Sequence, residues 1–149
     1  MFFCYCRYFF FADIPFVEPA KPYVNGLVAN SNLEKNNKQI LDNRNYFIKK
    51  LTDNFDKIKI NGDLEKRLPG NINVTFLSKD SLDILLTLDE FGICASAGSS
   101  CSTGDSLPSH VLTAIGLNAE EASGTIRFSL VKENTKDEID YVVNKLSYI

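Results

Sequence analysis

Apolar residues recur every three or four positions in four segments of the chain, and this spacing predicts four helices. Asp80 or Ser81 suits the N-cap of the second, Gly92 suits its C-terminal end, and Thr135 with Glu138 forms a capping-box pattern at the start of the fourth. The four helical stretches begin near Leu33, at Asp80 or Ser81, at Pro108 and at Thr135, and their last apolar residues are Phe55, Leu88, Ile115 and Leu146.

Alternation with a period of two marks the segments between these helices and predicts strands. The first strand is followed by Asn61-Gly62, a turn signal, and the last places Arg127 on the face opposite its apolar residues. The order of elements is α-β-β-α-β-α-β-α, so we expect an α+β domain with helices packed on one face of a mostly antiparallel or mixed sheet. The predicted strands are 57–60, 71–76, 93–95 and 125–130.

Composition adds little specificity but excludes some classes of partner. The 149 residues are 44% apolar and 23% charged with a net charge of −3, which fits one globular domain. There is no basic excess, so we expect no binding to nucleic acid or to an anionic membrane. Four cysteines are too few for a disulfide scaffold, and we expect a cytoplasmic protein with reduced thiols.

The first 11 residues, MFFCYCRYFFF, form a dense aromatic run. The run is too short to span a bilayer, and it lacks the features of a secretory signal. Three interpretations stay open: an edge strand, a tail that docks elsewhere, or the remnant of a longer chain.

Cys101 lies in the middle of a stretch of small and flexible residues, CASAGSSCSTGDSLPSH, that follows the third predicted strand. Such a segment suits a nucleophilic thiol that must move between two sites. A surface loop with an incidental cysteine explains the composition equally well. The spacings of Cys4 with Cys6 and of Cys94 with Cys101 do not match a zinc site, and the compartment disfavours a disulfide, so we expect no metal.

His110 and Arg127 are the other candidates for chemistry. His110 is the only histidine, and we favour a role in fixing the far end of the loop over a role as a catalytic base. Arg127 is either a solvated charge on a sheet or a group that holds a carboxylate through two parallel hydrogen bonds. Composition does not separate these two interpretations.

Four motifs together give the chain a family resemblance. They resemble the C-terminal part of the cysteine desulfurases, pyridoxal-phosphate enzymes of the class V aminotransferase type, and within them the long-loop subgroup that includes the nitrogen-fixation and general iron–sulfur assembly enzymes. The motifs are Arg67–Phe76, Gly92–Gly104, Pro108–Leu112 and Thr125–Ser129.

The resemblance implies a fold, a reaction and site residues. The fold is the small C-terminal domain of a pyridoxal-phosphate-dependent transferase. The thiolate of Cys101 takes the sulfur of L-cysteine as a persulfide and alanine is released, while Arg127 holds the substrate carboxylate. Cys94 is then a small buried residue, and His110 has no assigned proton transfer. The family further implies a sulfur acceptor such as an iron–sulfur scaffold, and a homodimer in full-length members.

The chain departs from the family in its cofactor site. Family members carry a Schiff-base lysine directly after a histidine in a large preceding domain, and this sequence has no His-Lys pair. Residues 24–149 match the C-terminal domain, whereas residues 1–23 match nothing in the family. We therefore expect a truncated chain with no cofactor-binding residue of its own and no activity alone. The alternative is a non-catalytic persulfide-carrying or dimerisation module.

Overall fold

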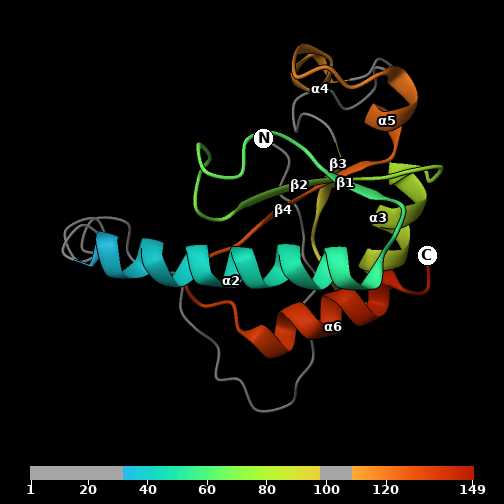
Figure 1. The fold of residues 1–149 in the computed structure, drawn as a ribbon. Helices are drawn as coiled ribbons and strands as arrows, with labels where there is room; N and C mark the ends of the chain where they lie inside the picture. The colour runs from blue at the N-terminus through green and yellow to red at the C-terminus, as the bar shows by residue number, and fades with distance from the viewer. Residues whose placement is uncertain (1–31, 98–108) are drawn as a thin grey trace, which may run out of the picture.

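A computed structural model describes residues 32–97 and 109–149 of the chain (Figure 1). The predicted helical and alternating patterns appear at nearly the predicted places. In chain order the elements are α2 (Leu33–Asn54), β1 (Ile58–Ile60), β2 (Asn71–Phe76), α3 (Ser81–Glu90), β3 (Ser96–Ala97), α4 (His110–Ala114), α5 (Ala119–Ser123), β4 (Thr125–Ser129) and α6 (Lys136–Leu146).

The four strands form one antiparallel sheet in the order β1-β2-β4-β3. The central pair is β2 with β4, where Val74 lies opposite Ile126 and Asn73 opposite Arg127. Since partners across a strand pair share a face, the sheet has one apolar face and one polar face. The α+β class and the antiparallel sheet are confirmed.

The helices α2 and α6 lie side by side beneath the apolar face (Figure 1). Phe47 of α2 reaches the sheet and its ring lies 5.1 Å from that of Phe128, centroid to centroid. α3 adds Ile84 and Leu88 to the same core, and both are fully buried. This single core holds the strands rigidly, which fixes the direction of the side chains on the opposite, polar face.

Two short helices, α4 and α5, lie on the other side of the sheet (Figure 1). They form a small cluster of their own from Leu112, Leu117 and Ala122. α5 was not predicted from the sequence, although Asn118 and Glu121 make a complete capping box at its start. The helix is only 5 residues long, too short for a periodic apolar pattern.

The predicted helix starts are confirmed by their hydrogen bonds. The Asp80 side chain accepts from the Leu82 N–H, and Thr135 and Glu138 form the predicted capping box. Gly62 has a φ of 78°, which the Asn61-Gly62 turn signal anticipates. The prediction for the third strand was wrong, because β3 is formed by Ser96–Ala97 and not by residues 93–95.

None of the helices in the described ranges is both long and apolar enough to cross a membrane.

Candidate functional site

A recess of about 360 Å³ opens on the polar face of the sheet. Its floor is formed by β2 and β4, which contribute Asn73 and Arg127. One wall is the β1–β2 connection, residues 61–70, and the other is α4 with its N-cap Ser109. Three separate parts of the fold therefore converge on one polar cavity, which we call the recess.

Arg127 lies where the alternation of its strand predicts. Its neighbours Ile126 and Phe128 are buried in the core, while Arg127 is half-buried and lines the recess. Across the sheet it faces Asn73 on β2 and Ser96 on β3. A guanidinium placed on a rigid central strand is well suited to hold a planar anion in a fixed orientation.

A second guanidinium, that of Arg67, enters the recess from the β1–β2 connection. It donates to the backbone carbonyls of Asn61 and Asp63, so the side chain is held in place. Its remaining terminal nitrogen, Nη1, is buried and has no hydrogen-bond partner. Burial, followed by the repulsion of Arg44, lowers the pKa of Arg67, and Asp63 opposes this effect.

The connection that carries Arg67 is itself anchored at two points. Asp63 Oδ1 accepts the backbone N–H groups of Glu65 and Lys66, both at 2.7 Å, and these bonds lower the pKa of Asp63. From α2, the buried Arg44 donates through Nη2 to the Leu64 carbonyl at 3.1 Å. The wall of the recess is thus tied to the main helical layer.

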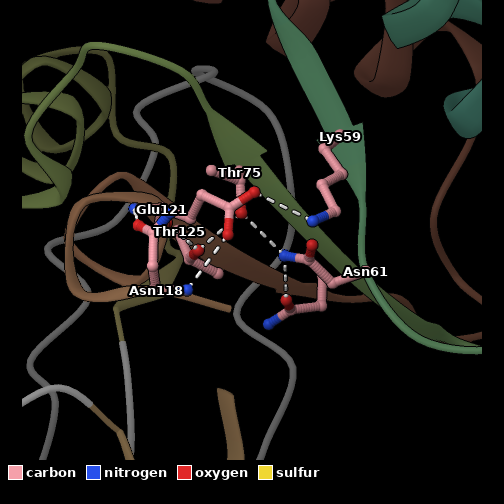
Figure 2. A network of polar contacts seen from close by, with 7 residues as sticks. Lys59, Asn61, Thr75, Asn118, Glu121 and Thr125 are labelled. Atoms are coloured by element: carbon pink, nitrogen blue, oxygen red, sulfur yellow. Dashed lines mark hydrogen bonds and ion pairs between the residues drawn. The ribbon is translucent and has the colours of Figure 1, made fainter. Parts of the chain in front are cut away.

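Asn61 lies at the inner end of the same wall and is 2% exposed. Its amide nitrogen donates to Asn73 Oδ1 and to Thr75 Oγ1, both at 2.8 Å. Figure 2 shows that this network continues from Thr75 to Thr125 and towards α5. Asn61 Oδ1 is buried and has no hydrogen-bond partner.

The charges around the recess are unbalanced. Among the described residues, three cationic side chains line it, Lys66, Arg67 and Arg127, together with one carboxylate, Asp63. The carboxylate is already engaged by two backbone N–H groups. The recess therefore favours a small anion, and two guanidiniums favour a carboxylate.

The recess does not fit a whole pyridoxal phosphate. Among the described residues that line it, Lys66 follows Glu65 rather than a histidine, and no aromatic ring or imidazole is available to stack on a pyridine. Asp63, the only carboxylate, accepts backbone N–H groups and is not poised for a ring nitrogen.

Two predicted site residues remain, Cys101 and His110. Cys101 falls in 98–108, outside the described residues, so its prediction is untested. His110 is the first residue of α4 and is exposed, next to Ser109 on the recess wall. Within 32–97 and 109–149 no group of three metal-ligating residues occurs.

Cys94 differs from its prediction in two respects. It follows the end of α3 and is exposed, whereas a buried residue was expected. It is also disulfide-bonded, whereas a reduced thiol was expected. Nothing in its position brings it into the recess.

The chain belongs to the class V aminotransferase family, whose sequence pattern matches residues 24–142. Within this family its similarity is to cysteine desulfurases.

Two relatives illustrate the degree of similarity. The chain is 38% identical over 124 residues to the cysteine desulfurase IscS of Clostridium botulinum, which covers 82% of this chain and 31% of the relative. It is 44% identical over 91 residues to a cysteine desulfurase of Nostoc sp., covering 61% of this chain and 23% of the relative. The chain thus spans about a third or less of these relatives.

Solved structures agree with this assignment. A NifS-like protein from Rickettsia africae superposes with a TM-score of 0.70 at 26% identity, over 85% of this chain and 33% of that one. A second NifS-like protein gives a TM-score of 0.69 at 28% identity. The resemblance stated from the four motifs is confirmed at the level of family and fold.

Proposed function

We propose that this chain is the part of a cysteine desulfurase that binds the substrate carboxylate and accepts the sulfur. Arg127 holds the carboxylate of L-cysteine, and the thiolate of Cys101 attacks the substrate sulfur. The carbon–sulfur bond of the substrate breaks, a sulfur–sulfur bond forms at Cys101, and L-alanine leaves. The products, alanine and the protein persulfide, account for every atom of cysteine and the thiol.

One observation carries the proposal: the segment that bears Cys101 begins at β3, which pairs with the strand of Arg127, and ends at Ser109, which lines the recess. The last residue of β3, Ala97, pairs with Ile126. Cys101 is four residues from Ala97, so chain length alone limits the distance between their Cα atoms to about 14 Å. A thiol within this reach supports sulfur transfer at the recess.

We propose that pyridoxal phosphate, on which this family depends, is held by polypeptide outside this sequence. The recess lacks groups for the pyridine ring, and the chain spans 31% of the Clostridium relative. The sulfur acceptor that we propose is a scaffold for iron–sulfur cluster assembly, and the assembled enzyme is a homodimer. The chain alone is then expected to release no sulfide or alanine from L-cysteine.

A hybrid enzyme tests this function. Residues 24–142 of this chain replace the matching part of the Clostridium relative, and the hybrid is supplied with pyridoxal phosphate and L-cysteine. We expect alanine release and a gain of one sulfur atom at Cys101 by mass spectrometry. Cys101→Ser should abolish both, whereas the matched control Ser102→Ala should keep both. Equal alanine release by wild-type and Cys101→Ser hybrids would refute the assignment.

The substrate arginine has its own test in the same hybrid. Arg127→Lys keeps the positive charge but loses the paired donors, so we expect KM for L-cysteine to rise about tenfold. A KM that does not change would show that Arg127 does not hold the carboxylate.

The alternative function, a non-catalytic persulfide carrier, predicts a different pair of results. The isolated chain would accept sulfur at Cys101 from an external persulfide, while the hybrid would release no alanine from L-cysteine.

A further inference from the structure

We propose that Arg67 and Asn61 contact the ligand of the recess, beside Arg127, and that the recess holds a free small amino acid by both of its charged ends. Arg67 shares the carboxylate with Arg127, and Asn61 Oδ1 accepts a hydrogen bond from the ammonium group. This inference rests on the proposed function, since it places two further binding residues at the same site.

The case for Arg67 starts from its geometry. Two of its nitrogens are used to hold the β1–β2 connection, through the carbonyls of Asp63 and Asn61, and this fixes the direction of the guanidinium. The third nitrogen, Nη1, is buried without a hydrogen-bond partner in a side chain that lines the recess. Leaving a buried charged donor unpaired costs free energy, and a carboxylate oxygen from a ligand removes that cost.

Asn61 presents the complementary group. It is 2% exposed, and its amide nitrogen is fully used by Asn73 and Thr75. These two bonds orient the amide, so Oδ1 is left as an acceptor with no donor in a residue that lines the recess. A ligand that brings a donor to this oxygen satisfies it, and an ammonium group is the strongest such donor.

Taken together, the orphan donor and the orphan acceptor define the class of ligand. A simple anion such as acetate satisfies Arg67 Nη1 but leaves Asn61 Oδ1 unpaired. A zwitterion with a carboxylate and an ammonium group on one carbon satisfies both ends. The cavity of about 360 Å³ accommodates a three-carbon amino acid of this kind.

Three small probes test the inference on the isotope-labelled full chain without any cofactor. L-alanine carries both charged groups, propionate carries only the carboxylate, and ethylamine carries only the ammonium. NMR follows the side-chain amide of Asn61 and the Nε–H groups of Arg67 and Arg127. We expect L-alanine to shift all three signals, propionate to shift the arginines with about tenfold weaker affinity, and ethylamine to shift none.

Substitutions complete the test. Arg67→Gln should weaken L-alanine binding about tenfold or more, whereas the control Lys57→Gln, which removes an exposed charge outside the recess, should change it less than about threefold. Arg67→Gln also removes the hydrogen bonds that hold the β1–β2 connection. If that variant unfolds, the titration of the wild-type chain with the three probes is the test of the inference. Shifts confined to Arg127 would overturn this inference while leaving the proposed function intact. Absence of any shift at Arg67 and Asn61 would also overturn it, whatever activity the hybrid enzyme shows.

Discussion

The hydroxyl oxygens of Thr75 and Thr125 lie 2.7 Å apart between the two central strands, and both residues are fully buried. The direction of this hydrogen bond follows from its neighbours. Thr125 donates its proton to the Glu121 carbonyl at 2.7 Å, so the Thr75 hydroxyl is the donor to Thr125. Asn61 in turn donates to Thr75 (Figure 2). A single directed chain of hydrogen bonds therefore connects the recess wall to α5.

Removing the Thr75 hydroxyl, which lies in the middle of this series of hydrogen bonds, should lower the stability of the fold. Thr75→Val keeps the shape of the side chain but deprives Asn61 of one acceptor and Thr125 of its donor. We expect the free energy of unfolding to fall by about 1–3 kcal/mol, measured by urea denaturation. Thr113→Val, at an exposed hydroxyl of α4, is the control and should change it by less than about 0.5 kcal/mol. An equal effect of the two substitutions would contradict the network.

The main core depends on the contact between α2 and the sheet. Phe47 is 1% exposed and packs against Phe128. Phe47→Ala should lower the free energy of unfolding by about 3–5 kcal/mol, because it removes a large buried ring and leaves a cavity. Leu82→Ala, at a position that is 61% exposed, is the matched control and should cost less than about 1 kcal/mol. Thermal unfolding followed by circular dichroism measures both.

Gly124 is required where α5 turns into β4. A Cβ atom at this position would lie 2.4 Å from the Phe76 carbonyl oxygen and 2.6 Å from that of Lys79. Since both obstacles are backbone atoms, Gly124→Ala should force the strands apart and cost about 1–3 kcal/mol in the same urea measurement. Ser123→Ala, one residue earlier and exposed, should stay within about 0.5 kcal/mol of wild type. If Gly124→Ala left the free energy of unfolding unchanged, the backbone at this junction would be able to shift without cost.

Helices and central strands could be predicted from sequence because each buries an apolar face with its own period. β2 was predicted with the observed bounds, the N-cap Asp80 was one of two candidates, and the capping box at Thr135 was predicted correctly. Short elements could not be predicted in this way, because they have too few residues to show a period. β3 has two residues and exists because it pairs with β4, so its position depends on a distant strand and not on local alternation.

The site was only partly predictable for a similar reason. Arg127 could be placed on the polar face by alternation alone. Arg67 is the first residue of one of the four motifs, and Asn61 belongs to a turn signal. Neither pattern predicts a role for the side chain. Their convergence with Arg127 depends on the anchoring of the β1–β2 connection by Arg44, which lies 20 residues before Leu64 in the chain. No local pattern carries that information.

The two large helices are joined by a charged cluster that should make stability depend on pH. Asp140 of α6 accepts from Lys50 at 2.8 Å and from the Tyr46 hydroxyl at 2.9 and 3.0 Å, both on α2. Lys50 first, and then Tyr46, lowers the pKa of Asp140, and the same carboxylate raises the pKa of Lys50. The carboxylate is therefore more acidic in the folded chain than in the unfolded chain, where its pKa is about 3.9.

The sign of the pH effect follows from this difference. Above about pH 4 the contribution of Asp140 to stability is fully present, and it is lost as the pH falls through the lower pKa of the folded state. Asp140→Asn should remove that contribution, so its free energy of unfolding should fall less than that of wild type between pH 5 and pH 3. Asp53→Asn, at an exposed carboxylate of α2, is the control and should fall as wild type does. Urea denaturation at each pH gives the three curves, and parallel curves for wild type and Asp140→Asn would show that the cluster does not link the helices.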